Sequence, residues 1–502
     1  MYLLIEILID TIDVYLMREI IMSDLSDRTI GKAGSIPARL ERLPISRYHW
    51  TLVILVGFIY MYESLDLGIT GTVSTVLGHF PGHTAFLIAF FGIAVTVGIV
   101  IGMAFSGRLA DRYGKRRIVL FGLIVLLGMS GIIAIIPANF PLLIALRVIQ
   151  GIAAGAVYAF PYSYLVEFIP KSRRGYFIGF IDLFFVFGYF MAPLISLFAI
   201  PYLSPSISWR VVFAIGFVPI VLYPLYYRYI PESPRWLERN GRYEDADRIV
   251  TGIEDRIRKQ YGRELPEPVI TEDLKEVEAT KPGVRDLFQR KYLRYSIPLW
   301  IYTSAMLSGF YISSIYAPTI FESFGFTAFY ALLFTLIMNG IMLFPKMGVM
   351  FTADRVGRKR LGIMLMALAA IFSLLLYTVH FSLVLVVVLV FAVFWSVNAN
   401  SPLWRMFASE TYPTTARQTG VYFNEMVSRL WSGVIFTLII GYDIVSASLK
   451  GSAKIHAIYF SYLLIAIISI IGVMSVYFLK ETANKQLEKI EYEINRETEV
   501  RQ

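Results

Sequence analysis

Two carboxylates, Glu63 and Asp66, stand one helical turn apart inside residues 50–77, a run that is otherwise long and apolar enough to cross a lipid bilayer. A charge at the bilayer centre costs roughly 2.5 to 3.5 kcal/mol even on lenient insertion scales, so such acids normally face a path for ions or substrate. Arg147, in the fourth apolar run, is expected at the same depth as Asp66. Because an acid that gains and loses an arginine partner can release and take up a proton, we predict a proton-coupling role for Asp66, Arg147 and Glu63. The alternative is a static ion pair that fixes the register of two helices.

A second charged group in an apolar run is Arg429, twelve residues after Arg417. Twelve residues of helix rise about 18 Å, which places this guanidinium near the bilayer midplane, where it suits a carboxylate bound in a bidentate fork. The alternative is that Glu425, one turn away, merely neutralises it. Arg405 is only five residues, about 7.5 Å of helix, from Glu410 near the cytoplasmic end of its span. Its side chain could therefore reach either the membrane surface or the substrate, and we leave both alternatives open.

The composition indicates an integral membrane protein. Of the 502 residues, 57% are hydrophobic and 17% charged, against about 45–50% apolar and about 25% charged in soluble domains. The net charge of +9 comes from short loops between apolar runs, which is expected of membrane topology and not of nucleic-acid binding. The chain has no cysteine, its 5 histidines show no metal-ligand spacing, and no G-x-x-x-x-G-K-[ST] loop occurs. We therefore expect no metal, no cofactor and no nucleotide hydrolysis.

Apolar windows of about 20 residues predict an all-α membrane protein with twelve membrane-spanning helices. The predicted spans are residues 50–76, 86–107, 118–136, 141–166, 176–200, 209–230, 293–317, 328–350, 361–379, 382–408, 420–443 and 455–479. They divide the chain into an N-terminal segment (1–48), a six-helix bundle (49–230), a polar linker (231–292), a second six-helix bundle (293–480) and a tail (481–502). Three loops on the linker side are rich in Lys and Arg, whereas three loops on the other side contain none. We therefore predict a cell-membrane protein with linker and both termini in the cytoplasm.

The first 22 residues carry Glu6, Asp10 and Asp13 at helical spacing. Acids at these positions are typical of neither a signal peptide nor a membrane span, so we assign the segment no function.

Two motifs recur 243 residues later in the second half. The loop GRLADRYGKRR after the second span returns as ADRVGRKR after the eighth, and E-x-x-P-x-x-x-R follows both the fourth and the tenth span. Two motifs at one spacing indicate a duplication, and duplicated halves with a site between them are typical of secondary transporters. We predict that the motifs form a cytoplasmic charge latch that closes in one state and breaks in the other. Its members are Gly107, Asp111, Arg112, Gly114, Arg116, Glu167 and Arg174, and in the second half Asp354, Arg355, Gly357, Arg358, Glu410 and Arg417. Plain positive-inside topology is the alternative, although it requires no fixed Asp, Gly or Glu.

With these motifs the chain resembles the major facilitator superfamily over nearly all of residues 48–490. The pattern G-x-x-x-D-R-x-G-x-R-R matches at every position in the first half, whereas Met350 replaces the leading glycine of the second copy. The resemblance implies two pseudo-symmetric six-helix bundles that work by alternating access.

Sugar-porter traits are present without the sugar ligands. PESPRWL (231–237), SGFYISSIYAPTIF (308–321) and LKETANKQLEKI (479–490) resemble that branch. The positions where those porters bind sugar are here Ala305, Met306, Tyr311, Asp182 and Arg405. A sugar site needs amide partners and an aromatic platform, and this chain carries charge at several of these places.

The eleventh span instead resembles organic-anion transporters, aromatic-acid:proton symporters and niacin-type porters, in the segment YPTTARQTGVYFNEMVSRLWSG (412–433). We therefore expect a proton-coupled importer of a small organic anion, with no enzymatic activity, acting as a monomer whose partners are substrate, protons and lipid. The expected substrate-site residues are Arg429, Asp182, Arg405, Tyr311, Asn424 and Glu425. A proton-coupled sugar porter remains the alternative. A multidrug exporter is disfavoured because the fifth span, FIDLFFVFGYFMAPLIS, lacks the glycine-proline-glycine antiporter pattern, and a nutrient receptor because only about twenty residues follow the last span.

Overall fold

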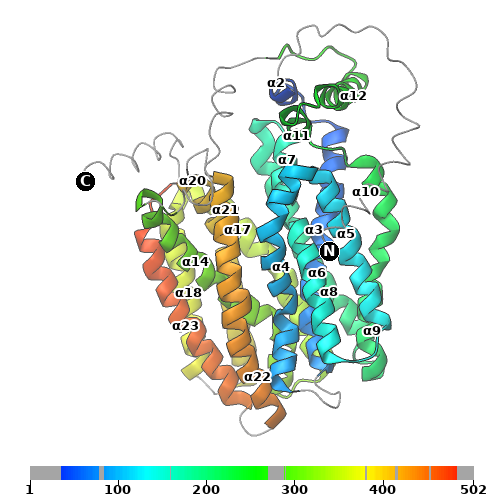
Figure 1. Cartoon of the computed structure of the whole chain (residues 1–502). Coiled ribbons are helices and arrows are strands. Elements are labelled where there is room, and N and C mark those ends of the chain that lie inside the picture. The colour runs from blue at the N-terminus through cyan, green and yellow to red at the C-terminus, as the bar shows by residue number, and fades with distance from the viewer. Residues whose placement is uncertain are drawn as a thin grey trace.

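The computed structural model describes residues 36–77, 84–158, 160–268, 288, 290–378, 382–412, 417–450 and 454–482, and in these ranges every regular element is a helix. Two bundles of long, roughly parallel helices stand side by side, with the linker helices gathered at one end (Figure 1). We call this end the linker side. The N-terminal acids Glu6, Asp10 and Asp13 lie outside the described residues, as does most of the predicted tail.

The first bundle contains the six predicted spans. Its helices are α3 (Arg47–Leu77), α4 (Ala85–Tyr113), α5 (Lys115–Ile135), α6 (Phe140–Tyr158), α7 (Phe160–Phe168), α8 (Lys171–Ala199), α9 (Pro205–Phe217), the 3-10 helix η1 (Val218–Leu222) and α10 (Tyr223–Tyr229).

The second bundle is more interrupted. Its helices are α14 (Arg290–Ile315), α15 (Ala317–Ser323), α16 (Ala328–Ile341), α17 (Leu343–Val356), α18 (Arg358–Thr378), α19 (Leu383–Ala399), α20 (Ser401–Thr411), α21 (Arg417–Arg429), the π-helix η3 (Leu430–Phe436), α22 (Thr437–Lys450) and α23 (Lys454–Phe478). Pro318 and Pro402 stand in the first turns of α15 and α20, where a proline without an N–H ends the preceding helix and is tolerated by the next.

Within the described residues, 11 helical segments are long and apolar enough to cross a membrane. The predicted seventh span corresponds to α14, which is not among them although its 26 residues extend about 39 Å. Its polar side chains explain the lower hydropathy, and Thr303, Ser308 and Ser313 are buried against other helices. This helix therefore stands at the place of the seventh predicted span while carrying polar groups that avoid lipid.

Helices α4 and α6 touch along glycines. A Cβ added at Gly98 would overlap the carbonyl oxygen of Val148, and one at Gly151 would overlap that of Val95. The backbones can lie this close only because no side chain separates them. The first half has glycine at four positions of this contact: Gly98, Gly102, Gly151 and Gly155. At the positions 243 residues later the second half has Ile341, Pro345, Phe394 and Asn398 instead.

The two bundles pack closely on the side away from the linker. There Asn339 of α16 donates a 3.0 Å hydrogen bond to the carbonyl oxygen of Tyr189 in α8. A Cβ on Gly433 of η3 would come within 2.6 Å of the Thr96 side chain in α4. These contacts hold the two halves together on that side.

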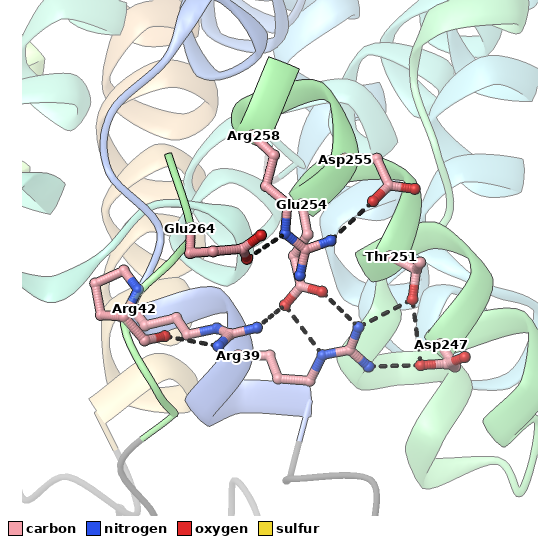
Figure 2. Close-up of polar contacts among 9 residues, drawn as sticks. Arg39, Arg42, Asp247, Thr251, Glu254, Asp255, Arg258 and Glu264 are labelled. Atoms are coloured by element: carbon pink, nitrogen blue, oxygen red, sulfur yellow. Dashed lines mark hydrogen bonds and ion pairs between the residues drawn. The ribbon is translucent and has the colours of Figure 1, made fainter. Parts of the chain in front are cut away.

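On the linker side, α2 (Ile36–Glu41) packs against α11 (Pro234–Arg239) and α12 (Tyr243–Tyr261). Figure 2 shows Arg39 and Arg42 of the N-terminal segment converging on Glu254 of α12. The guanidinium of Arg39 lies 2.8 Å and that of Arg42 2.6 Å from the Glu254 carboxylate, which is only 4% exposed. Burial would raise the pKa of Glu254, but the hydrogen bonds from Arg39 and Arg42 outweigh it and leave this pKa below its ordinary value. We call Arg39, Arg42 and Glu254 the linker clamp.

Candidate functional site

The predicted pair of Asp66 and Arg147 is present inside the first bundle. Arg147 Nη1 donates to Asp66 Oδ1 at 2.7 Å, and neither residue is more than 4% exposed. The same guanidinium also donates to Gln150 Oε1 at 2.8 Å and contacts the hydroxyl of Thr70. Gln150 in turn donates to Ser130 of α5 at 2.8 Å. The arginine therefore ties α3, α5 and α6 together, which fits a helix-register role as well as the predicted coupling role.

Arg429 lies between the two bundles. Its Nε donates to Glu425 Oε1 at 2.9 Å, so the alternative ion pair one turn apart is present. Its guanidinium carbon lies 4.1 Å from the ring centre of Tyr158, which belongs to the other half, and Tyr158 donates to Glu425 at 2.9 Å. Arg429 Nη1 donates to the Tyr311 hydroxyl at 2.8 Å. We call Arg429, Glu425, Tyr311 and Tyr158 the cross-half layer, because Tyr158 belongs to the first half and the other three to the second.

The π-helix η3 begins directly after Arg429. Such π segments are rare and occur frequently at functional sites. The wider turn changes the direction of the side chains that follow Arg429, and it places Gly433 against Tyr311 and Thr96.

Glu63 lies within reach of the charge of Arg429. It is fully buried, and neither of its carboxylate oxygens has a hydrogen-bond partner among the described residues. Arg429, Asp66 and Glu425 are all near enough for their charges to act on it. An ionised carboxylate buried without donors is costly, so this position suits a carboxyl group that carries a proton.

Asp182 and Arg405 form an ion pair that crosses between the halves. Asp182 lies on α8 of the first bundle and Arg405 on α20 of the second. Tyr162 donates a hydrogen bond to Asp182, and its hydroxyl oxygen is 3.2 Å from that of Tyr60. The sequence predicted both charged residues at the site but not their pairing.

Lys346 is a charged residue that the sequence reasoning missed. It lies on α17, is only 8% exposed, and its ammonium is 5.3 Å from the ring centre of Phe185 on α8. It has no hydrogen bond or ion pair among the described residues, but the charges of Asp182 and Arg405 are close enough to act on it. A lysine in the middle of an apolar span is the signal that could have identified it.

The structure places the two remaining predicted substrate residues, Tyr311 and Asn424, in different surroundings. Tyr311 contacts Arg429 in the cross-half layer, whereas Asn424 is buried and donates to Thr303 of α14 at 3.2 Å. Asn424 therefore joins two helices of the second bundle in this structure. Its role in substrate binding stays a prediction.

Among the described residues, the first copy of the predicted latch contacts its own half and the start of the linker. Lys115 Nζ lies 2.5 Å from Glu167 Oε1, and Ser233 donates to the same carboxylate. The backbone N–H of Arg116 donates to Glu232 at 3.1 Å, and its guanidinium donates to the carbonyl oxygen of Tyr227. Gly107, Asp111 and Arg112 are exposed. Whether these groups bridge the halves in another state stays a prediction.

The second copy repeats part of this arrangement. Glu481 accepts hydrogen bonds from the backbone N–H groups of Arg358 and Lys359, at 3.0 and 3.1 Å. Gly114 and Gly357 have φ of +99° and +94°, and a Cβ at either would collide with the capping glutamate, Glu232 or Glu481. A carboxylate at a helix N-terminus is stabilising, so each glutamate anchors the start of α5 or α18. Arg355 is exposed, while the side chains of Arg174, Asp354, Glu410 and Arg417 lie outside the described part of the chain.

A family model described as "Sugar (and other) transporter" matches residues 50–494. The chain belongs to this family. The protein is therefore a multi-pass membrane transporter of the major facilitator fold and not an enzyme, as the sequence motifs predicted. No group of three or more potential metal ligands occurs within the described ranges.

Curated proteins are similar to this chain over most of its length. The metabolite transport protein YyaJ of Bacillus subtilis (strain 168) is 30% identical over 412 residues, which make up 80% of this chain and 88% of that protein. The niacin transporter NiaP of Acinetobacter baylyi is 26% identical over 461 residues, which make up 90% and 99%. Among solved structures, the inward-open xylose transporter XylE from E. coli superposes with a TM-score of 0.68 at 19% identity, covering 88% of this chain and 99% of that one. The last comparison confirms the fold.

Proposed function

We propose that this transporter imports a small organic anion together with protons, by alternating access of a site between its two halves. The proposal rests on Arg429, a guanidinium that is 3% exposed and is held in the cross-half layer by Glu425, Tyr158 and Tyr311. Its Nη2 makes no hydrogen bond to the described residues. One N–H edge is thus free to donate to a carboxylate.

Glu63 offers a physical reason for proton coupling. With Glu63 ionised, Arg429 faces two carboxylates, Glu63 and Glu425, and a third from the substrate would be repelled. With Glu63 protonated, Arg429 and Glu425 balance each other and the incoming anion meets no excess negative charge. Proton binding and anion binding would therefore favour each other, as symport requires.

The role of Asp66 and Arg147 in this scheme is to move between paired and unpaired states as the first bundle rearranges. Their contact of 2.7 Å is the paired state. An Asp66 that loses Arg147 in a low-dielectric surrounding would take up a proton, and one that regains it would release the proton.

A sugar substrate is the second candidate. The family description names sugars, and SGFYISSIYAPTIF and PESPRWL resemble sugar porters. Several tyrosines line the layer, among them Tyr158 and Tyr311, and their hydroxyls and rings could contact a sugar. Against this candidate, the layer has exchanged amide side chains for ionic ones.

The deciding experiment is uptake into liposomes with an imposed proton gradient. Nicotinate and benzoate serve as carboxylates, nicotinamide as a neutral analogue, and xylose and arabinose as sugars. We expect a carboxylate to accumulate and a protonophore to abolish this accumulation. In Glu63→Gln, binding of the carboxylate should persist at all pH values and lose its pH dependence. If a sugar accumulates and none of the carboxylates does, the proposal is overturned.

A further inference from the structure

Three charged side chains are near one another between the halves: Asp182 of the first half, and Arg405 and Lys346 of the second. Arg405 is six residues, about 9 Å of helix, from the end of α20, whereas Arg429 is about 18 Å from the start of α21. An anion that leaves Arg429 toward the linker side therefore meets Arg405, the ion-pair partner of Asp182, next.

This group contains two cationic side chains, Arg405 and Lys346, but only one carboxylate, Asp182. Asp182 is already paired with Arg405 and accepts a hydrogen bond from Tyr162. Lys346 is almost fully buried on α17, its ammonium lies beside Phe185, and Phe185 is one helical turn from Asp182 on α8. A buried ammonium without an ion pair is costly, so its retention beside an existing pair calls for a function.

The pair is accessible to a ligand. The side chains of Arg405 and Asp182 are 22% and 21% exposed, whereas those of Arg147 and Asp66 deeper in the first bundle are 0% and 5% exposed. An anion can therefore approach Arg405 without first unfolding the site. If it takes Arg405 away from Asp182, however, a partly buried carboxylate remains unpaired, which is strongly unfavourable.

We propose that Asp182 changes partners, from Arg405 to Lys346, so that Arg405 can take the anion on its way to the linker side. This exchange relay rests on the proposed anion transport and adds a step to it. Both cations belong to the second half, so Asp182 bridges the halves before and after the exchange. Lys346 is then a positioning residue that neutralises Asp182 and does not have to touch the substrate.

The exchange of partners can be tested without any ligand, by thermal unfolding of purified full-length variants. Arg405→Met should lower Tm only slightly, because Lys346 takes over Asp182. Lys346→Met alone should also have little effect, because Lys346 has no ion pair in the present arrangement. Arg405→Met with Lys346→Met should lower Tm by about 4 °C or more beyond the sum of the single effects. Adding Asp182→Asn should restore it, since no carboxylate is then left unpaired.

Controls make the result specific to the relay. Lys259→Met changes an exposed lysine of α12 to the same residue and should be additive with Arg405→Met. Additive effects of Arg405→Met and Lys346→Met, or no recovery with Asp182→Asn, would overturn the exchange of partners.

A second arm uses nicotinate, with nicotinamide as the neutral analogue. Lys346→Met should weaken nicotinate binding about tenfold, and the double variant with Asp182→Asn should regain it. Unchanged nicotinate binding in Lys346→Met would overturn the link between the exchange and the anion. If no carboxylate binds the unaltered protein, the proposed function fails, while the unfolding cycle still decides whether Asp182 exchanges partners.

Discussion

Replacing Arg429 by lysine tests the proposed anion site most directly. The substitution keeps the positive charge beside Glu425 but removes the planar fork. In the structure Nε donates to Glu425 at 2.9 Å and Nη1 to Tyr311 at 2.8 Å, and Nη2 is left for a ligand. A single ammonium cannot serve these three directions at once, so at least one charge-assisted hydrogen bond to the carboxylate should be lost. Such a bond contributes about 1.5 to 3 kcal/mol, which corresponds to a Kd that is higher by about tenfold to a hundredfold.

The assay is binding of nicotinate and nicotinamide to purified protein, followed by uptake. The neutral amide should bind the unaltered protein more weakly and be nearly indifferent to the change, since it lacks the charge that Arg429 recognises. Arg429→Ala should weaken carboxylate binding further because Glu425 then lacks its cation. Arg210→Lys is a matched control: this arginine donates to the carbonyl oxygens of Ala134 and Ile136, away from the cross-half layer.

Equal losses for both ligands would indicate a folding defect and not a lost contact. If Arg429→Ala transports a carboxylate normally while Glu425→Ala alone destabilises the protein, the ion pair is structural. The sugar candidate would then become the better one.

Three further outcomes are expected. Asp66→Asn should abolish uphill, proton-driven uptake but spare exchange of labelled for unlabelled substrate, and a variant that still concentrates substrate would exclude Asp66 from coupling. If the loop acts as a latch, Asp111→Ala should speed the labelling of a cysteine introduced at the linker-side mouth, and the chain has no native cysteine to interfere. Unchanged labelling would mean that the loop only sets the membrane topology. Glu254 has a lowered pKa, so its contribution to the linker clamp should be complete above the ordinary pKa of a glutamate and be lost as the pH falls through its lower folded value. The protection of the amides of residues 36–41, measured as the exchange rate relative to the intrinsic rate at the same pH, should therefore fall in acid for the unaltered protein and already at neutral pH in Glu254→Gln. Full protection at neutral pH in that variant would contradict this account.

Features that depend on nearby residues could be predicted from the sequence. Span positions follow from runs of apolar residues, and even α14 lies where its run predicted it. The contact between Asp66 and Arg147, 81 positions apart, could also be predicted because the two charges lie at equal depth in the first and fourth spans. The ion pair of Arg429 with Glu425 was one of two alternatives because the two residues are one turn apart.

Features that depend on how the two halves dock against each other could not be predicted from the sequence. Asp182 and Arg405 are far apart in the chain, and only the docking of α8 against the second bundle brings them together. The helix-capping roles of Glu232 and Glu481 likewise require the chain to return to the start of another helix. The sequence does contain a signal for these caps, because a glutamate followed by Ser or Thr stands directly after the last span of each half. This signal is recognised only when the comparison of the two halves is continued past their last spans.

The glycine contact between α4 and α6 has a consequence for how the two copies can evolve. In the first half, Gly98 and Gly151 leave no room even for a methyl group, so almost any substitution there would push two helices apart. The second half has side chains at the corresponding positions, and its helices are divided by breaks and by a π segment next to Arg429. New substrate preferences should therefore arise mainly from replacements in the second half, while the first half tolerates few replacements along this seam. Deep mutational libraries selected on different carboxylates should show this asymmetry between copies that began as equals.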